Sequence, residues 1–292
     1  AAASLARRRL YNLVFVLPSS DNEFISALES QLTKQGMGSI HQRTILHKVL
    51  VPPFDPQAIV EKLDNLDAAK TDGVAILGPE TPAVRDAVKR VHARGIPVTA
   101  LVADLPSSER DYFVGIDNVA AGRTAAQLMG CFVRGSGPIL VITGSRLARD
   151  HLERRKGFEA VMAESFSHLE VLASVEGRDN PKLICQILPE VLRSHPNLRG
   201  IYSSAGGNPG LISCLSEGGM PKDLVVIAHE LTPSSRIALR DGLFDAIISQ
   251  DTGHLVRSAI RLLKATADQL PIDHTQERIR IDIYLKENIS TA

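Results

Sequence analysis

The chain has 292 residues, enough for one large domain or two of ordinary size. Lys plus Arg and Asp plus Glu both number 33, so the formal net charge is zero. This balance excludes a chain-wide electrostatic attraction to nucleic acid and gives no support to an acidic substrate or a membrane surface. Hydrophobic residues make up 44% and aromatic residues 4%, with no Trp, which favours an aliphatic core of parallel sheets buried on both faces.

The three cysteines, Cys131, Cys185 and Cys214, are an odd number with wide spacing. They predict buried free thiols in a reducing compartment. No apolar run is long enough to span a bilayer. The first ten residues, AAASLARRRL, place the arginines after the alanines, which is the wrong order for a secretory signal, although a mature protein could have lost one.

Apolar runs of strand length alternate with stretches of helical spacing in the first third of the chain. The predicted strands are 12–17, 44–51, 73–77 and 96–101, and the predicted helices are 24–36, 55–69 and 81–93. Strands that alternate with helices of this length indicate βαβ crossovers and a mostly parallel sheet.

The stretch 112–123, YFVGIDNVAAGR, separates two such series. A short apolar run ends at Gly115, and an alanine-rich helix begins at once. Asp117 or Asn118 can cap that helix, and Gly122 allows a close approach to its first turn. The chain is therefore expected to leave one α/β lobe here and enter a second.

The alternation of predicted strands and helices resumes after residue 123. The predicted strands are 138–143, 169–175, 200–203, 224–228 and 246–249, and the predicted helices are 148–164, 181–194, 207–217, 232–240 and 252–270. Residues 278–285 alternate strictly and predict an antiparallel or edge strand. The sequence thus predicts an α/β fold with two Rossmann-like lobes and parallel sheets, in which ligands bind at the carboxyl ends of strands.

Enzyme and metal motifs are not found. There is no G-x-G-x-x-G after a strand, no phosphate-binding loop and no H-E-x-x-H. The nine histidines have no metal spacing, and His151 and His229 are expected to be surface residues or to support a neighbouring site. We therefore expect no catalysis, no cofactor and no metal.

Polar side chains instead gather after the predicted strands. They are Asp21, Asn22, Asp104, Arg146, Arg149, Arg154, Glu230, Gln250 and Asp251. Carboxylates, amides and a guanidinium, with Phe24 as a ring platform, suit a sugar or polyol, which needs paired donors and acceptors and an apolar face. Taken singly, each residue could equally be a helix cap or a solvated loop charge.

Several segments resemble the effector domain of lactose-repressor-type transcription regulators and are also similar to the sugar-binding proteins of ribose-type transporters. The resemblance covers roughly residues 10 to 285, and the segments are LVFVLPSSDNEF, DGVAILGPE, FVGIDNVAAGRTAAQLM, PILVITGSRLARDHLERRKGFEAVM, VVIAHELTPSSR and ISQDTGHLVRSAI. Its most specific parts are VGIDN-x-x-AGR and R-x-x-GF. It implies a type I periplasmic-binding-protein-like fold, in which two lobes joined by three crossing segments close on a small ligand.

The resemblance also implies site residues. These are Asp21, Asn22 and Phe24 after the first strand, Asp104 after the fourth, and Arg154, Ser204, Glu230 and Gln250 in the second lobe. Glu23 stands where a second aromatic residue is common, and Ser204 and Ala205 replace an Asn-Asp pair. Glu230 replaces an Asp, so the ligand itself does not carry over from the family.

The expected lobes are 10–116 with 252–274 and 117–251 with 275–292. Their crossings are expected at 115–118, 250–251 and 273–276, with Asp117 and Asn118 as hinge residues that hold a crossing rather than ligand. Residues 1–9 are similar to the end of a hinge to a helix-turn-helix domain that these residues do not include.

The interpretation favoured by these patterns is the effector-sensing domain of a cytoplasmic regulator. It would form a homodimer through helices 82–93 and 123–132 and bind a sugar-like effector. Effector binding would control operator binding allosterically, through a helix-turn-helix domain that these residues do not include. A periplasmic sugar-binding protein of an ABC transporter stays open as the alternative; it predicts a monomer. An enzyme on a doubly wound fold is disfavoured because no nucleophile–base pair was found.

Overall fold

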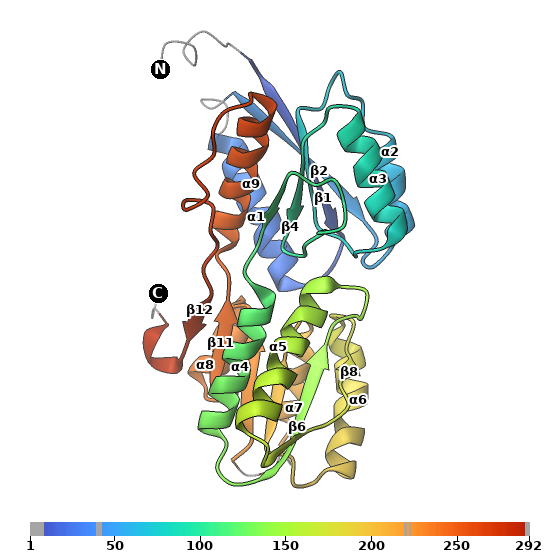
Figure 1. Ribbon diagram of the computed structural model, residues 1–292. Coiled ribbons are helices and arrows are strands. Elements are labelled where there is room, and N and C mark those ends of the chain that lie inside the picture. Colours follow the sequence, from blue (N-terminus) through green and yellow to red (C-terminus); the bar gives the residue numbers. More distant parts are fainter. Residues whose placement is uncertain (1–8, 39–42, 219–220, 222, 290–292) are drawn as a thin grey trace. The chain divides into compact units, whose positions relative to one another are not determined.

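The chain forms two compact units in a computed structural model that describes residues 9–38, 43–218, 221 and 223–289 (Figure 1). Unit 1 comprises Ala1–Asp21, Ile25–Gly115 and Asp251–Ile279, and unit 2 comprises Asn22–Phe24, Ile116–Gln250 and Arg280–Ala292. Apart from Arg9, the expected hinge remnant at residues 1–9 lies outside the described residues.

Unit 1 contains a five-stranded parallel sheet in the order β2-β1-β3-β4-β5. Its strands are β1 (Tyr11–Pro18), β2 (Thr44–Val51), β3 (Gly73–Ile76), β4 (Val98–Leu101) and β5 (Tyr112–Val114). Its helices are α1 (Glu23–Gly38), α2 (Pro56–Asp64), α3 (Pro82–Ala93) and α9 (Thr252–Ala267). Asp55 and Thr81 cap α2 and α3 by accepting from N–H groups of the first turn, and a proline follows each cap.

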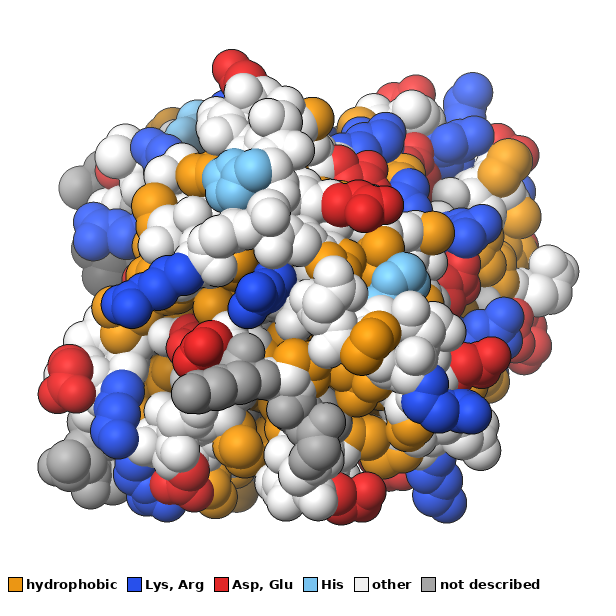
Figure 2. Space-filling model, turned by 90° about the horizontal axis from the view of Figure 1, so that it is seen from below, with side chains coloured by type: hydrophobic (Ala, Val, Ile, Leu, Met, Phe, Trp, Pro, Cys, Tyr) orange, Lys and Arg blue, Asp and Glu red, His pale blue; other side chains and the backbone are white. Residues whose placement is uncertain are grey.

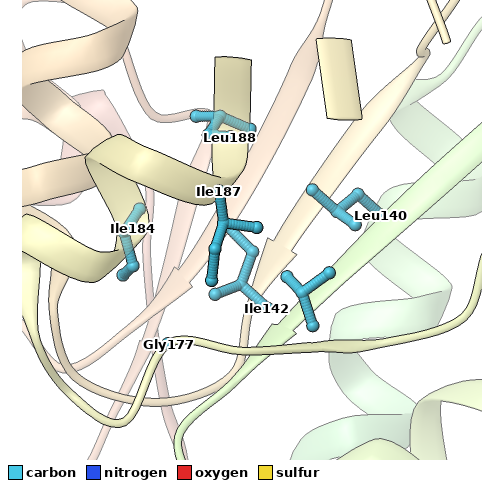
Figure 3. Close-up of a pocket in the computed structure, with 7 residues that line it drawn as sticks. Leu140, Ile142, Gly177, Ile184, Ile187 and Leu188 are labelled. Atoms are coloured by element: carbon cyan, nitrogen blue, oxygen red, sulfur yellow. The ribbon is translucent and has the colours of Figure 1, made fainter. Parts of the chain in front are cut away.

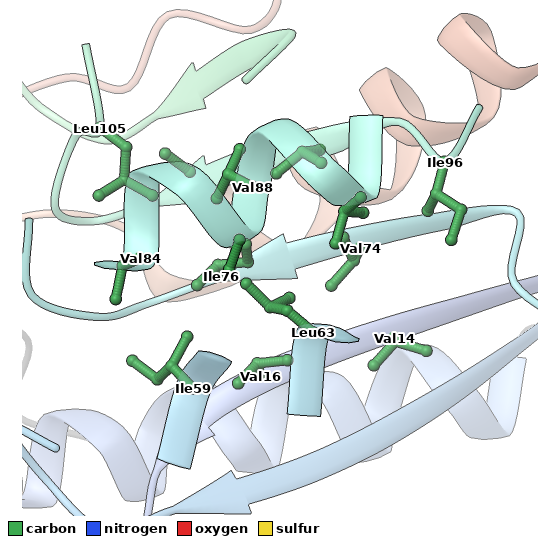
Figure 4. Close-up of a cluster of buried hydrophobic side chains, with 14 of the residues drawn as sticks. Val14, Val16, Ile59, Leu63, Val74, Ile76, Val84, Val88, Ile96 and Leu105 are labelled. Carbon is green, nitrogen blue, oxygen red and sulfur yellow. The ribbon is translucent and has the colours of Figure 1, made fainter. Parts of the chain in front are cut away.

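The core of unit 1 follows from the alternation of side chains along its strands. Val14 and Val16 of β1 face α2 and α3, where they pack with Ile59 and Leu63 in one buried aliphatic cluster (Figure 4). The opposite face of the sheet lies under α9, which contacts β1, β3, β4 and β5. A sheet covered on both faces accounts for β3 and β4, which are buried at every position.

Unit 2 is built on a seven-stranded sheet. The order is β12-β11-β10-β9-β6-β7, with β8 also paired to β6, and only β12 runs antiparallel. The strands are β6 (Gly137–Thr143), β7 (Leu169–Val171), β8 (Val175–Glu176), β9 (Gly200–Ser203), β10 (Val225–His229), β11 (Ala246–Ser249) and β12 (Asp282–Tyr284). The helices are α4 (Asn118–Phe132), α5 (Arg149–Ser165), α6 (Pro181–Ser194), α7 (Asn208–Ser216) and α8 (Pro233–Arg240), and a 3₁₀ turn covers Lys286–Asn288.

The two faces of this sheet carry different helices. Ile201 of β9 belongs to a buried cluster with side chains of α6, α7 and α8. Its neighbour Tyr202 points to the other face, where it stacks on Phe158 of α5 with ring centroids 4.5 Å apart. The faces therefore separate α6–α8 from α4 and α5.

The predicted α/β fold, with two Rossmann-like lobes on parallel sheets, is confirmed by this architecture. The predicted strand 169–175 is wrong in one respect, because it is two short strands: β7 pairs with the first half of β6 and β8 with its second half. Of the alternating stretch 278–285, only β12 is regular, and it is the predicted antiparallel edge strand.

Charges of both signs are interspersed on the face of the molecule shown in Figure 2. Oppositely charged side chains also form ion pairs in the described part of the chain, for example Arg90 with Asp64 at 2.8 Å and Arg261 with Glu277 at 2.7 Å. This mixing agrees with the formal net charge of zero.

Candidate functional site

The polar centre of unit 2 is Arg154 on α5, whose side chain is only 3% exposed. Its Nε–H donates to Asn118 Oδ1 at 2.9 Å, and its Nη1 donates to the carbonyl of Ser204 at 3.1 Å. These two contacts come from the first residue of α4 and from the loop that follows β9. The guanidinium is therefore held at the carboxyl end of the sheet, where parallel α/β sheets bind ligands.

Two glycines bring α4 and α5 into backbone contact beside Arg154. A Cβ on Gly122 would lie 1.9 Å from the Arg154 carbonyl oxygen, and a Cβ on Gly157 would lie 2.1 Å from the Val119 carbonyl oxygen. Only glycine permits this approach at either position. The contact sets the depth at which Arg154 enters the unit.

Glu230 follows β10 and lies beside Arg154, with Oε1 3.5 Å from Nη2. Gln250 Nε2 donates to the same oxygen at 2.9 Å, and Ser249 Oγ donates to Oε2 at 3.4 Å. The backbone of Glu230 adopts φ 67°, a left-handed conformation that is uncommon for a residue with a side chain. Such strain often occurs at functional sites, and here it accompanies a carboxyl group packed inside the unit.

The electrostatics of the site follow from burial. Burial raises the pKa of the Glu230 carboxyl above its usual range, while Arg154 and the hydrogen bonds from Gln250 oppose the shift. Burial also lowers the pKa of His229 well below its usual range, and the nearby positive charge of Arg154 lowers it further. His229 is therefore neutral, and Arg154 is the positive charge of this cluster.

Two polar atoms of the cluster have no hydrogen-bond partner among the described residues. They are Gln250 Oε1 and His229 Nδ1, and both are buried. Buried polar atoms are rarely left unpaired, because each costs the free energy of its lost hydration. An acceptor at Gln250 beside the donors of Arg154 is an arrangement that ligand hydroxyl groups can satisfy.

A second layer of polar residues supports the site from β9 and β10. Tyr202 and His229 share a hydrogen bond of 2.8 Å between the phenol and Nε2. Asn208, at the start of α7, donates to the His229 carbonyl at 2.9 Å and accepts from Ser203 Oγ at 2.8 Å. This network anchors the end of β10, directly before Glu230.

The residues predicted in the first lobe differ in their contacts, and Asn22 Nδ2 donates to Asp179 Oδ2, distant in the sequence, at 3.4 Å. Asp104 follows β4 and accepts two hydrogen bonds from Arg110, one of them from Nη2 at 2.8 Å. Asp21 is exposed. Asn22 Oδ1 accepts from the Phe24 N–H at 2.9 Å at the start of α1, and the Phe24 ring is 9% exposed. Asn22 and Phe24 group with unit 2 rather than with β1, which they follow.

Four of the predicted residues thus come together in unit 2: Arg154, Ser204, Glu230 and Gln250. Ser204 takes part through its carbonyl, because its fully buried hydroxyl donates to the Ile142 carbonyl at 3.1 Å. Asp117 caps α4 by accepting from the Ala120 N–H at 2.9 Å.

Asn118 was predicted as a hinge residue and His229 as a surface residue or a support for a neighbouring site, whereas Tyr202 was not singled out. His229 is the polar last residue of the otherwise aliphatic and buried strand VVIAH. This position is the sequence signal from which the supporting polar layer could have been predicted. His151, the other histidine singled out, is buried and accepts from the Ser145 N–H at 3.2 Å.

A small apolar cavity lies elsewhere in unit 2, between β6, β8 and α6 (Figure 3). Its lining consists of Leu140, Ile142, Val175, Gly177, Ile184, Ile187 and Leu188. It offers no polar group from a side chain, so it cannot orient a polyol. Within the described ranges, no group of three or more His, Cys, Asp or Glu is placed to hold a metal ion, and no helix is long and apolar enough to cross a bilayer.

A family model described as a periplasmic binding protein domain matches residues 13–270. The chain belongs to this family. The type I fold predicted from the resemblance is thereby confirmed.

Individual relatives are more distant. The ribose import binding protein of Escherichia coli (strain K12) is 24% identical over 269 residues, which span 89% of this chain and 88% of that protein. A solute-binding protein of an ABC transporter from Burkholderia graminis, solved with D-arabinose, has a TM-score of 0.85 at 24% identity and covers 97% of both chains. A glucose–galactose-binding protein from Geobacillus stearothermophilus has a TM-score of 0.85 at 19% identity and covers 97% of this chain and 99% of its own. At these identities the solved structures establish the shared fold.

These findings correct three predictions made from the sequence. The interpretation as a lactose-repressor-type regulator is wrong, because the relatives are import and solute-binding proteins. The predicted cytoplasmic location and the predicted role in transcription are wrong as well. The relatives are import binding proteins, and one solved neighbour is described as a periplasmic solute-binding protein of an ABC transporter. The motifs that suggested a regulator serve the fold: Asn118, Gly122 and Gly157 build the α4–α5 contact, and Asp117 caps α4.

Proposed function

We propose that this chain is the sugar-binding receptor of an ABC-type importer and works outside the cytoplasm. The observation that carries the proposal is the buried cluster of Arg154, Glu230 and Gln250 at the carboxyl end of the unit 2 sheet. The relatives support it, because their names include import binding proteins for ribose and solute-binding proteins solved with D-allose and D-arabinose. Binding and release need no covalent step, which agrees with the expected lack of catalysis.

The ligand class follows from the donors and acceptors of the cluster. A guanidinium has five N–H donors, and Asn118, Ser204 and Glu230 engage three of its nitrogens. The remaining N–H groups can donate to ligand oxygens, while Gln250 Oε1 and the Glu230 carboxyl can accept from hydroxyl groups. Adjacent donors and acceptors suit the vicinal hydroxyl groups of a small sugar or polyol.

The proposed ligand-binding set is the one expected from the sequence, with roles sharpened by the contacts above. It comprises Asp21, Asn22, Phe24, Asp104, Arg154, Ser204, Glu230 and Gln250, with Asp117 and Asn118 as hinge residues. Ser204 acts through its carbonyl on Arg154, and Arg110 orients the Asp104 carboxylate. In this role the partners are the membrane subunits of the importer, in place of operator DNA and a regulator homodimer.

A melting-temperature screen tests the proposal. The purified chain is heated with ribose, arabinose, allose, xylose and xylitol in turn, with glycerol at the same concentration as the control. A ligand present at about 100 times its dissociation constant adds about 2.7 kcal/mol of stability, which corresponds to roughly 5–10 °C for a unit of this size. A shift larger than that with glycerol is expected for at least one of these five compounds, and identical melting with all five and with glycerol would contradict a sugar receptor.

A further inference from the structure

Two of the three cysteines lie on helices that pack against each other in unit 2. Cys185 is on α6 and is half-buried, and Cys214 is on α7 and is 6% exposed. Both belong to the aliphatic cluster that covers one face of the unit 2 sheet. Cys131 lies on α4, on the other face, and is exposed. All three are free thiols in the structure.

The starts of α6 and α7 lie side by side. The Gly206 N–H donates to Asp179 Oδ1 at 2.9 Å, directly before the two helices begin. Each helix returns along the same face between parallel strands, α6 from β8 to β9 and α7 from β9 to β10, so the two helices run in the same direction. Residues one turn further along α6 therefore meet residues one turn further along α7.

The close approach of the helices places Cys185 opposite Cys214. A Cβ on Gly210 would lie 2.1 Å from the Pro181 carbonyl oxygen, so the backbones touch at this pair. Cys185 is four residues after Pro181, and Cys214 is four residues after Gly210, which is about one helical turn in each case.

Direct contacts agree with this register. The Cys185 thiol donates to the Gly210 carbonyl at 3.4 Å, at the turn of α7 that leads to Cys214. Cys185 is also close enough to Cys214 to contribute to the raised pKa of its thiol. Two cysteines one turn beyond a backbone contact, on helices that run in the same direction, are placed for the short Cα separation that a disulfide needs.

We propose that Cys185 and Cys214 form a redox site that closes to a disulfide between α6 and α7 by exchange with a small-molecule or protein disulfide. This site does not depend on which ligand the chain binds. The cross-link closes a loop of about 30 residues, a length for which a disulfide restricts the unfolded chain considerably. Oxidation is therefore expected to stabilise unit 2.

The chemistry proceeds in two exchange steps. The half-buried Cys185 attacks the external disulfide, forms a mixed disulfide and releases one external thiol. Cys214 then loses its proton to solvent and attacks the Cys185 sulfur, which forms the internal disulfide and releases the second external thiol. In sum, two protein thiols are oxidised to a disulfide and one external disulfide is reduced to two thiols.

The order of the steps follows from the surroundings of the two sulfurs. Burial raises the pKa of the Cys214 thiol to about 11, and the neighbouring Cys185 thiol adds to the shift. Cys214 is thus a weak initial nucleophile and acts second, once Cys185 is joined to a leaving thiol. Cys131 has neither of these cysteines on its face of the sheet, and Gln127 Nε2 donates to its sulfur at 3.3 Å.

The test uses the whole chain with Cys131→Ser, reduced, folded and then exposed to oxidised glutathione. The expected product has lost two hydrogens in mass and carries no glutathione. It offers no thiol for alkylation after unfolding, and unreduced digestion yields one peptide pair that joins positions 185 and 214. Its melting temperature should exceed that of the reduced protein.

Single-thiol variants in the same background provide the controls. With Cys214→Ser, glutathione should accumulate on Cys185; with Cys185→Ser, the buried Cys214 should stay reduced. Circular dichroism before oxidation establishes that each variant is folded, and Cys214→Ala replaces Cys214→Ser if the serine variant is not. A two-cysteine protein that retains glutathione on Cys185, keeps two thiols that can be alkylated, or forms the internal disulfide only in urea would overturn the proposal.

Discussion

Replacing Gly122 by Ala should damage unit 2 more than any ordinary helix substitution. The added Cβ would lie 1.9 Å from the Arg154 carbonyl oxygen and 2.7 Å from its carbonyl carbon. These are backbone atoms, so no side-chain rotation can relieve the clash, and α4 must move away from α5. Overpacking a core costs about 1–3 kcal/mol, and a backbone clash of this depth should reach the upper end, about 3 kcal/mol. This corresponds to roughly 6–12 °C in melting temperature.

Gly36→Ala is the matched control, because Gly36 also lies inside a helix, α1, but a Cβ there meets nothing within 4 Å. That variant should gain about 0.5–1 kcal/mol from its better helix propensity. Urea unfolding followed by circular dichroism measures both variants against the parent chain. Equal stability of Gly122→Ala and Gly36→Ala would refute the close α4–α5 contact and the placement of Arg154 that depends on it.

Three further substitutions probe the site. Asn118→Ala removes the acceptor of a buried Arg154 N–H and should cost about 1–3 kcal/mol in urea unfolding, with weaker ligand binding in calorimetry; unaltered affinity would show that Asn118 does not position Arg154. Because burial raises the pKa of Glu230, its stabilising contribution relative to Glu230→Gln should be complete at acid pH and decline as the pH rises through the raised pKa. Unfolding free energies of the two proteins across that range measure this difference, and a constant difference would contradict it. Arg110→Ala frees the half-buried Asp104 carboxylate and should cost at most about 1 kcal/mol; a loss several times larger would mean that this pair holds the fold of unit 1.

Most helices and strands could be predicted because the chain marks them locally. Aliphatic runs such as GVAI and VVIA are strands in sheets buried on both faces, and Asp55, Thr81 and Asn180 cap the helices that follow loops. The division of residues 169–175 into β7 and β8 could not be predicted, because it depends on how the two halves of β6 share their pairing.

The candidate site was accessible from the sequence only in part. Arg154, Glu230 and Gln250 stand at strand ends or helix starts, where position alone suggests function. Asn118 as the partner of Arg154 required the crossing of α4 and α5, which brings together residues 36 positions apart. The wrong prediction of a regulator has the same origin: Gly122 and Gly157 stand in the motifs because two helices touch, and this contact carries no information about what the domain is joined to.

Isothermal titration calorimetry tests the central claim most directly, with the sugar or polyol that gives the largest melting shift as titrant. The parent chain is compared with Arg154→Ala and with Arg155→Ala, which removes the neighbouring arginine on the same helix, where it donates to Ser174 Oγ at 2.9 Å. The proposed site predicts one ligand per chain, binding that is lost in Arg154→Ala, and affinity that is retained in Arg155→Ala. Unchanged affinity in Arg154→Ala, or no heat with any sugar or polyol, would contradict it.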